Sequence, residues 1–173
     1  SQYSSGELTV PACGAGTANV EFEVLTGLSV KFFGPGEYPY KSVLTEKTGE
    51  SLAYDLDSIG YTSHAIHNHR AVFYNRNTVF SNMGFDTFTS LEYMKDVAKT
   101  PKNWAKDNVL TGCILDALNS TKGRDMIYTI SVQGHGKYPS EKVIENPEIE
   151  VLSAPTEELK WKYEYYVNQI YEM

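Results

Sequence analysis

The order of the periodic segments constrains this fold most, because helical patterns alternate with short runs of strand type. The strand-type runs are residues 8–10, 61–67 and 126–132. The helical patterns are residues 17–28, 51–59, 104–118 and 156–173. Such alternation favours an α/β fold in which helices flank a layered sheet. A chain of 173 residues is long enough for one domain with a full core, so we expect a single domain over residues 1–173.

Glycine and proline residues predict where helices end and where turns and loops lie. The segment 11–16 predicts a turn before the first helix, and residues 32–40 are too rich in Gly and Pro for regular structure. Gly60 stands where a C-terminal cap of the helix 51–59 would be. The last helix is expected to be amphipathic, with one side formed by Leu159, Tyr163, Tyr166, Val167 and Ile170.

The charge and hydropathy of the chain argue against two classes of protein, nonspecific nucleic-acid binders and membrane-spanning chains. A net charge of -7 and a pI near 5.1 argue against nonspecific binding of nucleic acid, which needs many basic groups. No apolar run is long enough to span a bilayer, so the chain as given is expected to be soluble. It begins with Ser and shows no signal-peptide pattern, so we expect its N-terminus to be a cut end.

The two cysteines, Cys13 and Cys113, lie a hundred residues apart without metal-like spacing. Two isolated buried thiols are the favoured interpretation, and a disulfide between them stays open.

Thr17 is the first candidate for chemistry. It follows three small residues at the start of an expected helix, where unpaired backbone N–H groups and the helix dipole favour an anion. A divalent metal on its oxygen would activate the hydroxyl as a nucleophile. The alternative is that Thr17 only caps the helix, although Val20 stands where a capping box would have Glu.

Three of the four histidines, His64, His67 and His69, lie within six residues. If the strand continues, alternation places His67 and His69 on one face and His64 on the other. A zinc site of three histidines is therefore an unfavoured alternative, since a fourth ligand is also missing.

Three further side chains could contact a ligand. Arg76 could make a two-pronged contact with a phosphate, and Tyr74 could pack against a small polyol, although on local pattern each is more often a surface residue. His135 lies between two glycines after a predicted strand, at the sheet end where α/β folds place ligands. The alternative for His135 is a structural turn with a solvated side chain.

Four motifs in order resemble those of the lipoteichoic acid synthase family. They are Gly16-Thr17-Ala18-Asn19 with the segment 21–27, His67 with Phe73-Tyr74-Asn75-Arg76-Asn77, Asn82-Met83-Gly84-Phe85-Asp86, and the segment 132–139 around His135. Their order and spacing match over nearly the whole chain. The resemblance implies an alkaline phosphatase and sulfatase type of fold, of which this chain would hold an incomplete part.

The resemblance also implies an activity. In that family a threonine at the position of Thr17 attacks the phosphate of phosphatidylglycerol, and it also ligates the metal, usually manganese, with magnesium as an alternative. His67, Tyr74, Arg76 and His135 would then bind the glycerol phosphate. The expected partners are the phosphatidylglycerol head group or a glycerol phosphate polymer of the cell wall, at the extracytoplasmic face of the membrane.

The chain also departs from the family pattern. Tyr74 stands where Trp is frequent, and His69 where an acidic residue is frequent, which bears on the acceptor. The family takes further metal ligands from a Glu upstream and an Asp-His pair downstream, and neither is present here. We therefore expect a fragment of a membrane-anchored enzyme, with little metal binding or activity of its own and with its anchor in segments outside this sequence.

Two other functions stay open. A metal-dependent phosphodiesterase or a sulfatase-type ester hydrolase would keep the fold and use water as the acceptor. Arylsulfatase activity is disfavoured, because Cys13 is not followed by a Cys-x-Pro-x-Arg pattern. The other function is a binding module that recognises glycerol phosphate without turnover.

Overall fold

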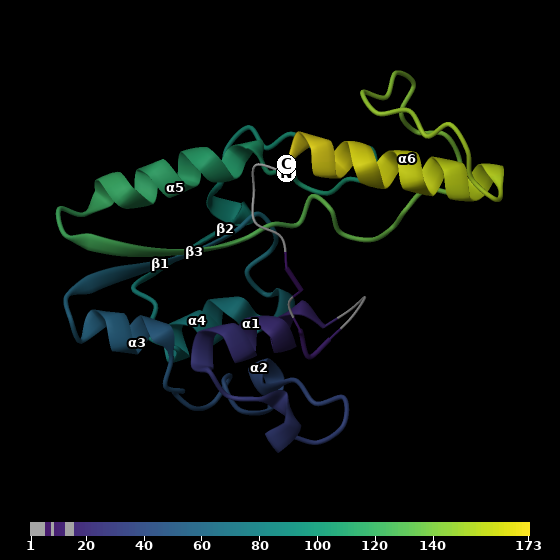
Figure 1. The fold of residues 1–173 in the computed structure, drawn as a ribbon. Helices are drawn as coiled ribbons and strands as arrows, with labels where there is room; N and C mark the ends of the chain where they lie inside the picture. Colours follow the sequence, from purple (N-terminus) through teal and green to yellow (C-terminus); the bar gives the residue numbers. More distant parts are fainter. Residues whose placement is uncertain (1–5, 8, 13–15) are drawn as a thin grey trace. The chain divides into compact units, whose positions relative to one another are not determined.

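The computed structural model describes residues 6–7, 9–12 and 16–173, which form two compact units (Figure 1). Unit 1 comprises Ser1–Ser63, Val72–Thr87 and Gly123–Met126. Unit 2 comprises His64–Ala71, Phe88–Lys122 and Ile127–Met173. The expected single domain 1–173 is therefore made of two locally compact parts.

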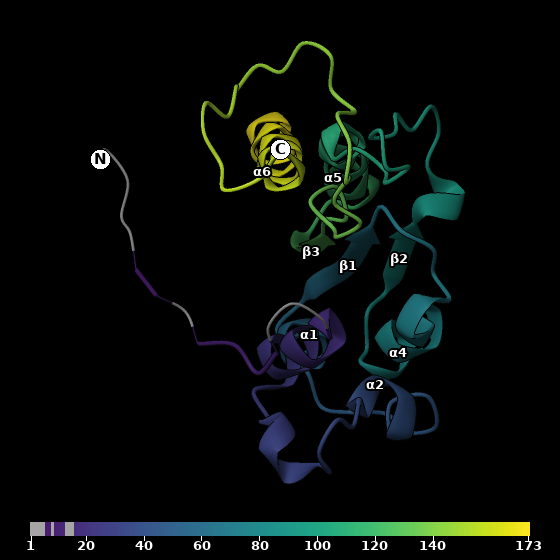
Figure 2. The same ribbon diagram turned by 90° about the vertical axis from the view of Figure 1, so that its right-hand side faces the viewer.

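A small parallel sheet confirms the predicted α/β class. Its strands are β1 (Tyr61–His67), β2 (Thr87–Ser90) and β3 (Arg124–Ile130), in the order β2-β1-β3 (Figure 2). β1 has the predicted bounds, and its last five residues are buried. β3 begins two residues earlier than predicted and is mostly half-buried, because in the described sheet it has a strand neighbour on one side only. The short strand β2 was not predicted.

Unit 1 contains four helices, α1 (Thr17–Thr26), α2 (Pro39–Ser42), α3 (Leu52–Asp57) and α4 (Arg76–Asn82). Short 3₁₀ turns cover Val30–Phe32 and Phe73–Asn75. Helix α1 packs against α2 and α3, and the 3₁₀ turn before α4 packs against α2. The buried apolar residues of this unit are Ala18, Phe22, Leu25, Tyr40, Leu44, Ala53, Val79, Phe80, Met83 and Phe85.

The ends of the helices in unit 1 follow their capping residues. Helix α1 stops two residues before the predicted end, since Gly27 takes a left-handed φ of 67° and its N–H bonds back to Glu23. Helix α3 is shorter than residues 51–59 because Ser51 is its N-cap and Ser58 its C-cap. Pro39 starts α2 inside the segment predicted to be irregular, at a first helical position where its missing N–H costs nothing.

The strand predicted over residues 8–10 is wrong where the structure describes it. Thr9 and Val10 are in no strand, and Leu8 lies outside the described residues. A strand needs a paired neighbour for its backbone hydrogen bonds, and so short a run has few bonds to offer.

Unit 2 contains α5 (Asn108–Ser120), α6 (Glu157–Glu172) and a 3₁₀ turn at Leu91–Tyr93. Helix α5 starts four residues later than predicted, because Trp104 accepts a bond from the Thr100 N–H and Ala105 pairs with Lys99 as an isolated bridge. The buried apolar residues of this unit are Ala65, Ile66, Ala105, Leu110, Val132 and Tyr165.

The predicted apolar side of the last helix is not its buried side. In α6, Tyr163, Tyr166 and Ile170 are exposed, while the buried residues are Glu164, Tyr165, Asn168 and Gln169. The buried side chains bond to segments that cover them, so polar partners decided which face α6 buries. No helix in the part of the chain that the structure describes is long and apolar enough to cross a membrane.

Candidate functional site

Thr17 lies at the first helical position of α1 and is exposed, as the prediction of a helix start required. The alternative that Thr17 is the N-cap is wrong, because Gly16 occupies that position with φ 80° and ψ 36°. A glycine offers no side chain to cap the helix, and α1 has no side-chain hydrogen bond at its N-cap. The first-turn N–H groups beside the Thr17 hydroxyl therefore form a local environment that suits an anion.

Two tyrosines and a lysine accompany this helix start. A Cβ placed on Gly16 would lie 3.1 Å from the Tyr38 hydroxyl, so glycine is needed both for the left-handed φ and for this close approach. The rings of Tyr38 and Tyr74 lie 5.4 Å apart between centroids. The Lys41 Nζ lies 5.3 Å from the Tyr38 centroid and 5.2 Å from the Tyr74 centroid.

Sequence reasoning missed Tyr38 and Lys41 as members of this cluster. Both lie in or next to the segment 32–40, which was predicted only to be irregular. The signal that could have found them is the run of aromatic residues beside a lysine, although aromatic residues are as frequent in plain cores.

Tyr74 has a backbone conformation that is rare for a side chain of its size. Its φ is 58°, and the following Asn75 has φ 55°, so two consecutive residues are left-handed. Burial raises the pKa of the Tyr74 phenol, and the neighbouring Tyr38 raises it further. Tyr74 is therefore held in place as a neutral hydrogen-bonding group.

Arg76 is buried, which contradicts the local expectation of a surface residue. Its Nε donates to the Glu21 carboxylate over 3.0 Å, its Nη2 donates to the other oxygen of that carboxylate, and its Nη1 donates to the Phe73 carbonyl over 3.2 Å. Three of the five guanidinium N–H groups thus have acceptors in the protein.

The pair of Arg76 with Glu21 fixes the helix that carries Thr17. Glu21 stands four residues after Thr17, so both lie on the same side of α1. The pair ties the start of α4 to that side of α1, and the Arg76 guanidinium also lies 5.2 Å from the Tyr74 ring centroid. Of the predicted site residues, Arg76 and Tyr74 thus lie against each other, and Arg76 is tied to α1 one turn after Thr17.

The other two predicted site residues, His67 and His135, belong to unit 2. His67 is buried, and its Nδ1 lies 2.8 Å from the Ile130 carbonyl oxygen. A carbonyl oxygen only accepts, so Nδ1 carries the hydrogen of this bond.

A row of rings connects these two histidines within unit 2. The centroid distances are 5.8 Å from His67 to His69, 5.7 Å from His69 to Trp104, and 4.5 Å from Trp104 to His135. The Trp104 Nε1 donates to the Gly136 carbonyl over 2.8 Å, and the Lys137 Nζ lies 5.0 Å from the Trp104 centroid. Sequence reasoning had placed Trp104 in a helix and missed it as the residue that joins the two histidine segments.

The described residues do not form a complete metal site. No group of three or more His, Cys, Asp or Glu residues within ranges 6–7, 9–12 and 16–173 is arranged to hold an ion. His64, His67 and His69 therefore form no zinc site there. The Thr17 hydroxyl supplies one oxygen, whereas divalent ions in proteins take four or more ligands. The donors in the described part of the chain thus do not make up a metal site by themselves.

Cys113 has a free thiol and is half-buried, and burial raises its pKa. Cys13, the other cysteine of the prediction, lies outside the described residues.

Comparison with known proteins gives a family match over most of the chain. The family profile described as Sulfatase matches residues 9–173. A protein of Rhizobium meliloti (strain 1021), described as a putative cyclic beta-1,2-glucan modification protein, is 34% identical over 145 residues, which are 84% of this chain and 22% of that protein.

Solved structures share the fold at low sequence identity. The phosphoglycerol transferase GacH of Streptococcus pyogenes, solved with sn-glycerol-1-phosphate, has a TM-score of 0.71 at 23% identity over 94% of this chain and 43% of that one. The lipoteichoic acid synthase LtaP of Listeria monocytogenes has a TM-score of 0.65 at 21% identity over 89% of this chain and 38% of that one. The C-terminal periplasmic domain of EcEptC from Escherichia coli, solved as a complex with Zn, has a TM-score of 0.55 at 21% identity over 91% of this chain and 42% of that one. This chain therefore spans less than half the length of the proteins it matches.

Proposed function

Because this chain belongs to the sulfatase family, we propose that it is part of a metal-dependent phosphoglycerol transferase. The enzyme moves glycerol phosphate from phosphatidylglycerol to a polyol or glycan acceptor through a phosphothreonine intermediate on Thr17. The observation that carries the proposal is the exposed Thr17 hydroxyl at the uncapped N-terminus of α1, the helix to which Arg76 is tied one turn later.

The reaction has two balanced steps. In the first, the Thr17 hydroxyl loses its proton as its oxygen attacks the phosphorus of phosphatidylglycerol, the bond from phosphorus to the diacylglycerol oxygen breaks, and that oxygen takes up a proton. In the second, the acceptor hydroxyl attacks the phosphothreonine, loses its proton, and returns the Thr17 oxygen as a hydroxyl. The backbone N–H groups of the first turn of α1 stabilise negative charge on the phosphoryl oxygens in both steps.

The remaining candidate residues are proposed to bind and orient the glycerol phosphate group. Tyr74, whose backbone is held in the left-handed region beside Arg76, is proposed to hydrogen-bond the glycerol moiety. Arg76 is proposed to position α1 through its pair with Glu21. Its guanidinium N–H groups that are not used in the bonds to Glu21 and Phe73 are proposed to donate to the phosphate. His67 and His135 are proposed to hold oxygens of the glycerol phosphate or relay protons.

A divalent ion, manganese with magnesium as an alternative, would lower the pKa of the threonine hydroxyl and screen the phosphate charge when bound. Thr17 is proposed as one of its ligands, and such an ion needs several more. The reaction is proposed to take place at the extracytoplasmic face of the cell membrane, where the protein would be anchored through segments not contained in this chain.

The relatives support this choice of donor and acceptor. GacH, whose fold this chain shares, was solved with sn-glycerol-1-phosphate, and the relative from Rhizobium meliloti is described by its modification of a cyclic glucan. We therefore propose that the glycerol phosphate group comes from the phosphatidylglycerol head group and that a neutral glucan is the acceptor. A glycerol phosphate polymer is the alternative partner.

The test uses the full-length protein that contains this chain, with phosphatidylglycerol labelled in its glycerol head group. Thr17→Ala is expected to abolish both diacylglycerol release and a covalent glycerol phosphate adduct seen by mass spectrometry, because the attacking oxygen is gone. Thr17→Ser is expected to retain part of both, since it keeps a hydroxyl. Thr48→Ala, an exposed threonine away from α1, is the matched control and should behave as wild type.

The other functions give different results in the same assay. A hydrolase would release diacylglycerol and free glycerol phosphate with no acceptor added and no product on the glucan. A binding module would retain glycerol phosphate in Thr17→Ala and show neither release nor adduct in the wild type. Unchanged turnover by Thr17→Ala would overturn the proposal.

A further inference from the structure

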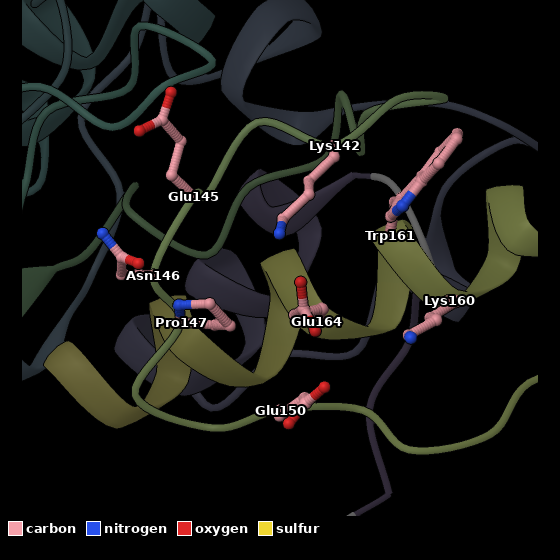
Figure 3. Close-up of a pocket in the computed structure, with 8 residues that line it drawn as sticks. All are labelled: Lys142, Glu145, Asn146, Pro147, Glu150, Lys160, Trp161 and Glu164. Carbon is pink, nitrogen blue, oxygen red and sulfur yellow. The ribbon is translucent and has the colours of Figure 1, made fainter.

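A pocket in unit 2 lies apart from every residue assigned so far. It has a volume of about 380 Å³ and is lined by Lys142, Glu145, Asn146, Pro147 and Glu150 from one loop and by residues of α6 (Figure 3). Helix α6 contributes Lys160, Trp161 and Glu164. In Figure 3, Trp161 and Pro147 lie on opposite sides of the view, with Lys142 and Glu164 between them. A volume of this size is typical of sites for small molecules.

The loop that forms one wall of the pocket is fixed to α6 by buried side chains. The Asn168 amide donates to the Ile149 carbonyl over 2.8 Å and accepts from the Ile149 N–H over 3.0 Å. The Glu164 carboxylate accepts from the Val151 N–H over 3.2 Å. Asn168 and Glu164 are each 5% exposed, so the α6 side of these part-buried bonds is shielded, and the bonds tie the loop to the helix.

The side chains that line the pocket argue against anions and metal ions as its ligands. The lining includes three carboxylates, of Glu145, Glu150 and Glu164, and two ammonium groups, of Lys142 and Lys160, so it has a formal net charge of 2 − 3 = −1. A phosphate or another anion would meet this negative excess. A metal site is excluded within the described residues, because no group of three or more His, Cys, Asp or Glu is arranged to hold an ion.

The lining suits a neutral ligand that is rich in hydroxyl groups. Carboxylates accept hydrogen bonds from hydroxyls, whereas ammonium and amide groups donate to them, and the pocket has all three kinds of group. Trp161 is half-buried, so part of its indole is accessible as an apolar surface. An indole presents a flat apolar surface together with one polar N–H, which matches the apolar face and polar rim of a sugar ring.

We propose that this pocket binds a neutral oligosaccharide, with Trp161 as the stacking surface and with Glu150 and Lys142 as hydrogen-bonding partners. Its use as the subsite for a glucan acceptor rests on the proposed function, whereas the binding itself does not. The site would hold sugar units of the acceptor that do not react, which adds binding energy and selects glycans over simple polyols.

The experiment measures binding of cyclic β-1,2-glucan, a neutral probe, to the protein by isothermal titration calorimetry without any lipid donor. Trp161→Ala is expected to weaken binding by at least about tenfold. Glu150→Gln is expected to weaken it by a factor of about three, which is less than the free energy of one hydrogen bond. Tyr163→Ala is the matched control, because Tyr163 is an exposed aromatic residue of α6 that does not line the pocket. Circular dichroism verifies that each variant is folded.

Glu150 is exposed, so Glu150→Gln keeps the proposal testable even where Trp161→Ala does not fold. Equal glucan affinity of the wild type and a folded Trp161→Ala, or no binding by the wild type, would overturn the proposal. If Trp161→Ala does not fold, unchanged affinity of Glu150→Gln would overturn it. Glycerol phosphate should not compete with the glucan, and competition would contradict a neutral site.

The failure of this inference can be told apart from the failure of the proposed function. Thr17→Ala should bind the glucan as tightly as the wild type, since Thr17 is not part of the pocket. Trp161-dependent binding in a protein without transferase turnover would leave the pocket assigned and reject the proposed reaction. Turnover with glucan that Trp161→Ala leaves unchanged in both kcat and KM would reject the pocket alone.

Discussion

The two units bury polar groups of different kinds. Among the described residues of unit 1, Arg76 is the largest fully buried side chain, and its charge is paired with Glu21. In unit 2 amides are the most numerous kind of buried polar side chain, and among them Gln133, Asn168 and Gln169 bond to one another or to backbone groups.

This difference predicts which substitutions destabilise each unit most. A buried ion pair loses its compensation when one partner is removed, because the remaining charge has neither water nor a counter-charge. A neutral amide that loses its partner costs only the desolvation of a polar group. Unit 1 should therefore depend on one pair of residues, whereas unit 2 should distribute its polar stabilisation over several bonds.

The largest expected effect comes from breaking the ion pair. Glu21→Gln removes the negative charge beside buried Arg76 and keeps the shape of the side chain, so we expect a loss of about 3 kcal/mol in the free energy of unfolding, measured by urea denaturation. The double variant Glu21→Leu with Arg76→Met removes both charges and should lose much less than Glu21→Gln. A loss of less than about 1 kcal/mol in Glu21→Gln would mean that the pair does not dominate unit 1.

An intermediate effect is expected in unit 2 from Asn168→Ala. This change removes the two bonds to Ile149 and the bond to the Glu164 carbonyl, and we expect a loss of about 1–3 kcal/mol. Asn119→Ala, at an exposed position of α5, is the control and should stay within about 0.5 kcal/mol of the wild type. An effect of Asn168→Ala larger than that of Glu21→Gln would reverse the comparison.

The smallest effect is expected from Tyr165→Phe. It removes the hydrogen bond of 3.0 Å to the Thr100 hydroxyl, which is worth about 1 kcal/mol. Burial raises the pKa of the Tyr165 phenol above its ordinary value near 10, so the neutral phenol is favoured in the folded state. Its contribution to stability is therefore complete below pH about 10 and is lost as the pH rises through the raised pKa.

The pH dependence is measured as the difference between the wild type and Tyr165→Phe in urea denaturation from pH 8 to about pH 11. The wild type should lose stability more steeply above pH about 10 than the variant. Tyr163→Phe, at an exposed position of the same helix, should follow the wild type. Equal slopes for all three would show that the burial of Tyr165 does not affect its ionisation.

The sequence predicted the fold class and several elements well. β1 matches its predicted bounds, and α1 begins at the predicted Thr17, because strong local signals mark both: a run of strand formers in the first case and a glycine turn in the second. Boundaries set by longer-range bonds were missed. Helix α5 begins after Trp104 because that residue is held by Thr100 and not by the helix.

The candidate site was predicted in part. Thr17, Tyr74 and Arg76 were named from the sequence, and the structure places Arg76 against Tyr74 and ties Arg76 to α1 one turn after Thr17. Their roles in chemistry stay predictions, as do those of His67 and His135. Tyr38, Lys41 and Trp104 were missed because their importance comes from contacts with residues distant in the sequence.

By itself the sequence determined the alternation of helices and strands, the glycine that starts α1, and the set of residues available for phosphate chemistry. These depend on local backbone preferences and on periodic patterns, which short windows of sequence contain. Only the tertiary structure decided that Arg76 is buried against Glu21 and that α6 buries Asn168 and Glu164 while it exposes Tyr163 and Ile170. The physical reason is that a polar side chain is buried only where a distant segment supplies its partner, and no local pattern encodes that partner.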